Sequence, residues 1–378
     1  MDFTKLTAYI DSLYSVSVPA CDLIVYRDHE MLYRHMAGWR DMEKTVPLTG
    51  DETYNMYSCS KVMTSCAVMQ LIGSGKLGLD DPVSKWLPEY ASLKVKGPDG
   101  VHPAKNTLTV RHLLSMQGGF DYNLASSSIL ETNRAHGGKA NTRQIIGALA
   151  QEELHFEPGE DFLYSLCHDI LGAVIEEVTG CRFSDYLREH IWKPLGLEHT
   201  GFTFIASMEK THTAQCWFNG FDKPLGVLEK SDVPYALSPE YESGGAGLIS
   251  CAEDYAKFCD TIACGGRTAD GLEILSPEMI RLWSTPQLCP KAKETFDAWN
   301  RIGYSYALGV RTRVDTAKGR KGPVGEFGWD GAAGSYLFID PFSHTSAFFA
   351  MHVRNFGYCY DVIHPTLQTL IYEAIEDK

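Results

Sequence analysis

The sequence predicts an α+β fold: an antiparallel sheet built from both ends of the chain and flanked by helices, with an inserted helix-rich domain. Alternating apolar positions, typical of strands, occur near both ends, whereas apolar spacings of three and four residues, typical of helices, fill the middle. We expect a discontinuous sheet domain over residues 1–82 and 244–378 and the inserted domain over residues 83–243. The cleft between the two domains is the expected functional site.

The first elements follow from the apolar pattern. An amphipathic helix opens the chain, and residues 20–38 are predicted to form two strands joined at Asp28-His29-Glu30. After Ser58, apolar residues recur every three or four positions until Gly73. This change of period predicts a helix that faces the core.

The later elements carry their own start and stop signals. A helix is expected from Leu166 to Val178, because Gly180 suits the left-handed position after a helix. Two further helices are expected to begin at the capping box formed by Ser250 and Glu253 and at Ser276-Pro277-Glu278. Strands are expected over residues 335–339 and 346–353, and an amphipathic helix closes the chain.

Composition excludes several classes of protein. The 378 residues are 44% hydrophobic and carry a net charge of −14, which suits a globular protein and disfavours nucleic acid and anionic membrane surfaces as partners. No stretch approaches the roughly 18 apolar residues of a membrane span, and the first residues do not resemble a secretory signal. The eleven scattered cysteines contain no CxxC pair, which favours reduced thiols. We therefore expect a cytoplasmic protein.

Patterns typical of metal or phosphate chemistry fail on spacing. His29-Glu30 and His35 lack the spacing that places two zinc-binding histidines on one helical face. Residues 73–76, Gly-Ser-Gly-Lys, lack the earlier glycine of a phosphate-binding loop, and no GxSxG elbow occurs. We expect neither a metal nor a cofactor.

Ser58-Cys59-Ser60-Lys61 is a Ser-x-x-Lys motif at the start of the first core-facing helix. One helical turn places the two side chains on one face, where a lysine of lowered pKa can take the serine proton. The N–H groups at the helix start favour the negative charge that then develops. Ser207 and Lys210 match the same pattern without an apolar helix behind them, so the motif alone leaves a serine cap with a solvated lysine as an equal alternative.

The context of this motif resembles the serine β-lactamase-related hydrolases, which include class C β-lactamases, DD-peptidases and family VIII carboxylesterases. The similarity begins at residues 56–61 and 75–83. It continues in family order through residues 110–114, Glu157-Pro158-Gly159, Tyr164-Ser165, Leu171-Gly172, residues 243–248 and residues 329–334. The resemblance implies a β-lactamase/transpeptidase-like fold with Ser58 as the nucleophile.

The resemblance also implies roles around this nucleophile. Tyr164 matches the tyrosine of the second family motif and would act as general base and acid, sharing proton transfer with Lys61. Trp329-Asp330-Gly331 matches the third motif, and Gly331 allows a close backbone approach. The N–H of Ala332 would join that of Ser58 as the oxyanion hole.

Two departures from the β-lactamase pattern bear on the substrate. Leu166 stands where the Tyr-x-Asn motif has its asparagine, and Trp329 stands where the third motif often has lysine. Both favour a neutral or hydrophobic acyl partner, as in the esterase branch. Asp330 is unusual in either branch, and it either repels substrate carboxylates or turns away.

Several aromatic residues and one histidine are further candidates for the substrate pocket, although such residues in loops more often pack against the core. These candidates are Tyr122, Trp217, Phe120, Tyr241 and His168.

The sequence thus predicts a serine hydrolase that forms an acyl-enzyme on Ser58, most simply a carboxylesterase for small or hydrophobic esters. The expected partner is a small-molecule ester or amide. Alternatives with the same chemistry are a transacylase, a D-amino-acid amidase or peptidase, and a weak β-lactamase. A non-catalytic binding protein is an alternative of another class, motivated by Leu166 and Asp330.

Overall fold

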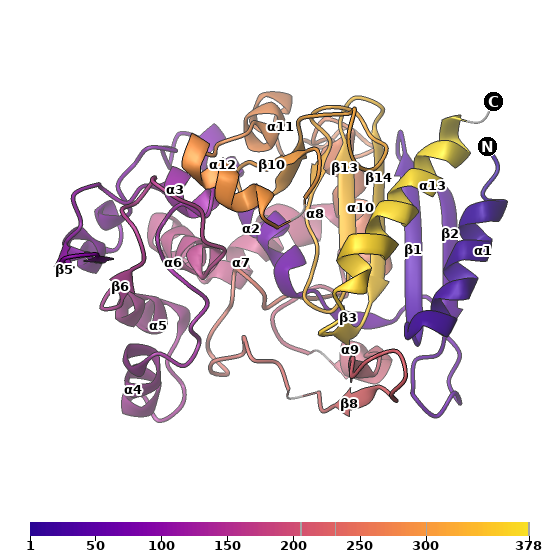
Figure 1. Ribbon diagram of the computed structural model, residues 1–378, viewed down its shortest axis with the longest axis horizontal. Helices are drawn as coiled ribbons and strands as arrows, with labels where there is room; N and C mark the ends of the chain where they lie inside the picture. Colours follow the sequence, from indigo (N-terminus) through magenta and orange to yellow (C-terminus); the bar gives the residue numbers. More distant parts are fainter. Residues whose placement is uncertain (205, 231, 300, 377–378) are drawn as a thin grey trace.

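The main sheet of the protein combines strands from both ends of the chain (Figure 1). The structure is a computed structural model that describes residues 1–204, 206–230, 232–299 and 301–376. Within these residues the sheet has seven strands, in the order β10-β11-β12-β13-β14-β1-β2, and every pairing in it is antiparallel. This confirms the predicted α+β class.

The N-terminal hairpin lies at one edge of the sheet. β1 (Ala20–Arg27) pairs with β2 (Glu30–Gly38) on one side and with β14 (Thr345–Met351) on the other. The hairpin turn is therefore where the sequence predicts it.

The other strands have these bounds: β3 (Thr53–Asn55), β4 (Lys94–Gly97), β5 (Gly100–Pro103), β6 (Glu153–Leu154), β7 (Gln215–Trp217), β8 (Gly226–Leu228), β9 (Ile249–Cys251), β10 (Tyr304–Tyr306), β11 (Arg311–Arg313), β12 (Phe327–Gly328), β13 (Tyr336–Asp340) and β15 (Val353–Arg354). The α-helices have these bounds: α1 (Thr4–Ser12), α2 (Ser60–Gly73), α3 (Val110–Leu114), α4 (Ser127–Ala135), α5 (Thr142–Leu149), α6 (Cys167–Thr179), α7 (Phe183–Leu187), α8 (Lys193–Leu195), α9 (Ala206–Thr211), α10 (Ala252–Ala263), α11 (Pro277–Ser284), α12 (Pro290–Asp297) and α13 (His364–Glu376).

Each face of the main sheet is covered by helices, because successive side chains of a strand point to opposite sides. Leu23 and Val25 of β1 pack in one cluster with apolar residues of α1 and α13, and these two terminal helices contact each other (Figure 1). Ile24, between them in the sequence, packs in the larger cluster with residues of α2 and α10. The terminal helices therefore lie on one face of the sheet, and α10 and α2, the helix that contains Lys61, lie on the other.

Helix α2 is buried on all sides. Every residue from Ser60 to Met69 is buried, because apolar or small residues surround the whole helix axis. The predicted core-facing helix is confirmed, and its complete enclosure explains how Lys61 comes to be shielded from water.

The predicted helix ends are right in two cases and wrong in one. Gly180 follows α6 with φ +72°, and the Ser276 hydroxyl accepts the Met279 N–H at the start of α11. The predicted capping box at Ser250 is wrong. Ser250 belongs to β9, and Cys251 caps α10 by accepting the Asp254 N–H at 3.4 Å.

The predicted strand over residues 346–353 is interrupted at His352. The side chain of His352 accepts the Asn55 N–H at 3.3 Å, and β14 ends before it. The chain then forms β15, which pairs in parallel with β7 and sets Arg354 opposite Trp217. The C-terminal part of the predicted strand thus leaves the main sheet.

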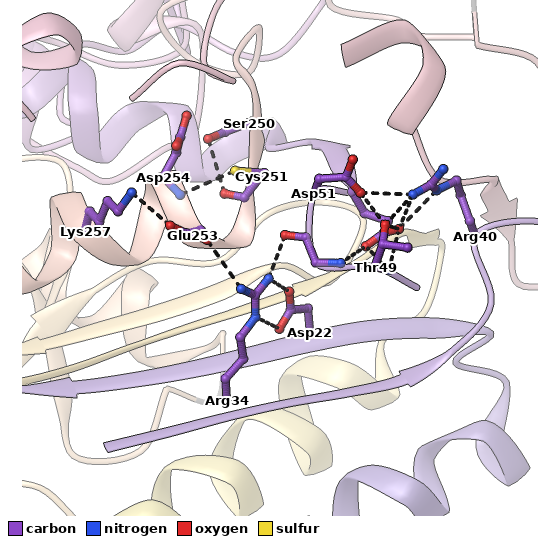
Figure 2. Close-up of polar contacts among 12 residues, drawn as sticks. Asp22, Arg34, Arg40, Thr49, Asp51, Ser250, Cys251, Glu253, Asp254 and Lys257 are labelled. Carbon is purple, nitrogen blue, oxygen red and sulfur yellow. Dashed lines mark hydrogen bonds and ion pairs between the residues drawn. The ribbon is translucent and has the colours of Figure 1, made fainter. Parts of the chain in front are cut away.

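Ion pairs fix the segment that leads to Ser58 (Figure 2). Arg34 of β2 pairs with Asp22 of β1 at 2.8 Å and with Glu253 of α10 at 3.4 Å, and it also donates to the carbonyl of Gly50. Farther along, Arg40 pairs with Asp51 at 3.0 Å. The loop before β3 is thereby tied to both the sheet and α10.

Helices α3 to α6 occupy the end of the molecule away from the chain termini (Figure 1). The boundaries of residues 83–243 as an inserted domain stay a prediction. All eleven cysteines are free thiols. Within the described ranges, no helix combines the length and the apolar character that crossing a bilayer requires.

Candidate active site

Ser58 lies in a single 3₁₀ turn, Tyr57–Cys59, that leads directly into α2. The Ser58 residue is 9% exposed, at the margin of the buried core. Tyr57 has φ +46°, a left-handed conformation that is costly for a bulky residue. A hydrogen bond from the Tyr57 hydroxyl to Gln215 and the burial of the ring hold this conformation. The backbone is thus bent at the residue before the serine.

Lys61 donates to three acceptors. Its Nζ lies 3.3 Å from Ser58 Oγ, 2.7 Å from the Tyr122 hydroxyl and 2.7 Å from the carbonyl oxygen of Gly245. Burial lowers the pKa of Lys61 to about 7, although the negative charge of Asp169 opposes this shift. A lysine with this pKa is partly neutral near pH 7 and can accept a proton.

Asp169 is a buried carboxylate behind the lysine. It accepts hydrogen bonds from the Tyr241 hydroxyl at 2.7 Å and from Ser243 Oγ at 2.6 Å, while burial raises its pKa. Its contacts hold the segment that carries Gly245, whose carbonyl accepts from Lys61. No feature of the sequence singled out Asp169.

Tyr164 lies between the lysine and the third motif. The Trp329 indole N–H donates to the Tyr164 hydroxyl at 2.8 Å, and the two rings stack at 5.5 Å. Lys61 Nζ is 4.5 Å from the centre of the Tyr164 ring. Burial raises the pKa of Tyr164 well above its usual range, and hydrogen bonds with Ser58 and Trp329 only partly oppose this shift. The neutral phenol is therefore the favoured form.

The third motif lies against the backbone that precedes the serine. A Cβ atom on Gly331 would meet the carbonyl oxygen of Met56 at 2.5 Å, so only glycine permits this approach. Among the described residues, neither the Ser58 N–H nor the Ala332 N–H has a hydrogen-bond acceptor. Both donors are thus available to an oxyanion.

Asp330 turns away into the protein. Its carboxylate pairs with Arg301 at 3.1 Å and with Arg311 at 3.8 Å, and its side chain is 8% exposed. Burial disfavours the charge, but the surrounding positive groups, with Arg301 first among them, together outweigh this effect and lower the pKa of Asp330. Asp330 therefore turns away into the protein and forms internal ion pairs, which is the second of the two alternatives that the sequence leaves open.

The other pocket candidates fall into different environments. Tyr122 contacts Lys61, and Tyr241 contacts Asp169. Trp217 is 36% exposed on β7 and is not among the described contacts of Ser58. The remaining three are buried: Leu166 and Phe120 pack in the main core, and the ring of His168 is within hydrogen-bond distance of Ser65.

Two aromatic residues that no sequence motif indicates also contact the aromatic side chains around Ser58 and Lys61. The Tyr235 ring meets those of Tyr57 and Tyr122, each at 5.7 Å, and the Trp299 ring meets that of Tyr164 at 5.4 Å. Their positions in loops far from the motifs gave no signal.

Among the residues that the structure describes, two groups of side chains place potential metal ligands close together, and neither group includes Ser58 or Lys61. One comprises His29, Asp260 and Cys264, and the other comprises His199, Cys251 and Asp254. In each group the protein already engages the aspartate, which accepts from His29 in the first and from the His199 N–H in the second.

Comparison with known proteins identifies the family of this chain. Residues 9–356 match the family described as Beta-lactamase. The chain belongs to the Beta-lactamase family. This family contains proteins of several activities. Membership therefore indicates the fold and the serine hydrolase class, but it does not identify the substrate.

Individual relatives carry more specific names. Esterase EstB of Burkholderia gladioli is 29% identical over 288 residues, which cover 69% of this chain and 71% of EstB. Acyltransferase calJ of Penicillium decumbens is 28% identical over 349 residues, covering 86% of this chain and 82% of calJ. The solved structure of EstCE1, described as a hydrolase with promiscuous acyltransferase activity, superposes with a TM-score of 0.80 at 24% identity and covers 98% of both chains.

Proposed function

We propose that this protein is a carboxylesterase that forms an acyl-enzyme on Ser58. The observation that carries the proposal is the 3.3 Å contact between Ser58 Oγ and the amine of Lys61, whose pKa burial lowers to about 7. A nucleophile within hydrogen-bond reach of a base that is neutral near working pH is the minimum that serine acylation requires.

The first half-reaction uses these groups in order. Neutral Lys61 takes the proton of Ser58 as the serine oxygen bonds to the ester carbonyl carbon. The carbonyl oxygen becomes an oxyanion between the N–H groups of Ser58 and Ala332. When the C–O bond breaks, the leaving alkoxide receives a proton from the Tyr164 phenol, which regains one from protonated Lys61.

The second half-reaction repeats the sequence with water. A water molecule attacks the acyl carbon, gives its proton to the same lysine and tyrosine unit, and Ser58 leaves with a proton while the carboxylic acid departs. The raised pKa of Tyr164 favours Lys61 as the initial proton acceptor, with Tyr164 as the relay.

Small or hydrophobic esters are the proposed substrates. Rings of Tyr122, Tyr164, Tyr235 and Trp329 surround the lysine and serine, and the cation that often occupies the third motif is replaced by an indole. Such walls favour apolar acyl groups. EstB, a relative at 29% identity, is named as an esterase.

An activity-based probe tests the proposal. Wild type, Ser58→Ala and Ser207→Ala are incubated with a phosphonate ester and weighed intact. We expect one adduct on wild type and on Ser207→Ala, which alters the second Ser-x-x-Lys pattern, and none on Ser58→Ala. Equal labelling of wild type and Ser58→Ala would refute the assignment, and labelling of neither would favour a non-catalytic binding protein.

Acyl transfer is the second candidate, supported by the name of the relative calJ. The acyl-enzyme would then pass to an alcohol or amine instead of water. Product analysis with a p-nitrophenyl ester in the presence of a primary alcohol separates the two: hydrolysis gives the free acid, and transfer gives a new ester. A chromogenic cephalosporin and D-amino-acid amides, tested in parallel, measure the β-lactamase and amidase alternatives.

A further inference from the structure

We propose that Arg354 forms an anion-binding subsite that recognises a carboxylate at the far end of the substrate's acyl chain. This inference rests on the proposed esterase function and narrows its substrate class to half-esters of dicarboxylic acids. Arg354 lies on β15, with its guanidinium carbon 5.6 Å from the centre of the Tyr57 ring and 5.2 Å from that of Trp217.

The charge of Arg354 lacks a carboxylate partner among the described residues, at the 4.0 Å limit for an ion pair. Its Nη1 donates to the backbone carbonyl of Asp232 at 3.3 Å, and the side chain also hydrogen-bonds with Tyr57. The Asp232 carboxylate instead accepts the Glu229 N–H. A guanidinium carries five N–H donors in a planar fork, so donors remain for an incoming carboxylate.

The two aromatic contacts orient this fork. Arginine stacks its flat faces on aromatic rings and leaves the N–H edge free for a planar anion. On its inner side, Arg354 contacts the fully buried ring of Tyr57. On its outer side, it contacts Trp217, which is 36% exposed, and Arg354 itself is half-buried. The subsite is therefore rigid on its inner side and reachable from solvent on its outer side.

A continuous run of rings connects this subsite to the nucleophile. Tyr57 directly precedes Ser58, and its ring meets that of Tyr235 at 5.7 Å. Tyr235 in turn meets Tyr122 at 5.7 Å, and the Tyr122 hydroxyl contacts Lys61. The fully buried Tyr57 ring backs this run, so the partly buried rings of Tyr235 and Tyr122 are the apolar faces left to meet the substrate. They suit the methylene chain of an acyl group whose carbonyl lies at Ser58 and whose terminal carboxylate lies at Arg354.

Carboxylate is the anion that this arrangement favours. It accepts two parallel hydrogen bonds from the guanidinium fork, and it is the group that a short acyl chain most simply carries at its far end. The aromatic run suits an acyl chain that is apolar between its two ends, so the proposed preference for hydrophobic acyl groups applies to that middle part of the substrate.

Two p-nitrophenyl esters of equal chain length test the subsite: the neutral pentanoate and the anionic hemiglutarate. The measured quantity is the ratio of kcat/KM for the anionic ester to that for the neutral ester. We expect Arg354→Gln to lower this ratio by about tenfold or more, mainly through KM, because a charge-assisted hydrogen bond to the substrate is lost. Arg354→Lys, which keeps the charge without the planar fork, is expected to give an intermediate ratio.

Arg134→Gln is the matched control, because Arg134 is an exposed arginine on α4 and its loss changes the net charge equally. Its ratio should equal that of wild type, and the wild-type ratio should fall as salt is added. An unchanged ratio in both Arg354 variants would overturn the subsite while the esterase function stands. If Arg354→Gln does not fold, the lysine variant and the salt dependence decide. If neither ester acylates Ser58, the proposed function is refuted, and the subsite is refuted with it.

Discussion

The amine of Lys61 lies 2.7 Å from the hydroxyl of Tyr122, a residue 61 positions away in the sequence. This contact gives the lysine an acceptor that neither the Ser-x-x-Lys motif nor the second family motif supplies. The protonation of Lys61 therefore also depends on the Tyr122 phenol, whose ring contacts that of Tyr235. Burial is the main cause of the lowered pKa of Lys61, and the hydrogen bond to Tyr122 adds a contact from outside the motifs. This contact yields a specific prediction for Tyr122.

Replacing Tyr122 with phenylalanine should move the pH profile towards acid. The hydroxyl oxygen accepts from Lys61 and stabilises its protonated form, so its loss lowers the pKa of the lysine further below about 7. We expect the acidic limb of kcat/KM to shift to lower pH and the plateau to fall by about tenfold, since one contact to the proton-transfer unit is lost. Tyr235→Phe, which keeps its ring, is the control, and the same shift in that variant would contradict the assignment.

The wild-type enzyme should lose activity in acid with a single apparent pKa near that of Lys61. The base acts as the neutral amine, which is present above its pKa and absent below it, so kcat/KM should rise through about pH 7 and then level off. Initial rates across this range at constant ionic strength provide the measurement. A rate that is highest in acid and falls through neutral pH would exclude Lys61 as the base.

Trp329→Phe should separate hydrogen bonding from packing. The phenyl ring keeps the stack against Tyr164 but removes the N–H that donates to its hydroxyl at 2.8 Å. We expect kcat/KM to fall by about tenfold or more with little change in the thermal midpoint. Trp329→Ala should also destabilise the protein by about 3–5 kcal/mol, because it opens a cavity. Equal unfolding midpoints for both variants would contradict this division.

Gly331→Ala should damage the site through the backbone. Its Cβ would lie 2.5 Å from the Met56 carbonyl oxygen, which forces the third motif away from the segment that holds Ser58. We expect kcat/KM to fall by about 100-fold, as misplacement of an oxyanion donor commonly costs this much. Gly357→Ala is the control, because a Cβ there meets nothing within 4 Å. Near-normal activity in Gly331→Ala would show that the two segments do not need this close approach.

Much of the fold could be predicted because its signals are local. The hairpin turn after β1, the α6 stop at Gly180 and the α11 cap at Ser276 each depend on residues within a few positions of one another. The Ser250 cap failed because a tertiary pairing of β9 with β3 occupies that residue, which leaves Cys251 to cap α10. Local patterns cannot register such competition.

In the candidate site, too, only the contacts between residues close in the sequence could be predicted from local patterns. Ser58 and Lys61 are one helical turn apart, so their contact follows from the motif. Tyr164 and Ala332 required family resemblance, because their distances from Ser58 in the chain carry no geometric information. Asp169 and Arg354 had no signal at all. Their roles depend on burial and on loop packing that brings separate segments together.

The proposed mechanism requires Ser58 to carry the acyl group during turnover. The most direct measurement is an acid quench of wild-type enzyme during hydrolysis of a p-nitrophenyl ester, followed by mass spectrometry of the peptides. We predict that the mass of the peptide that contains Ser58 increases by the mass of the acyl group. This increase should be absent when the reaction is quenched only after the ester has been fully hydrolysed. Steady turnover with no acylated Ser58 peptide, or with the acyl group on another residue, would contradict the claim.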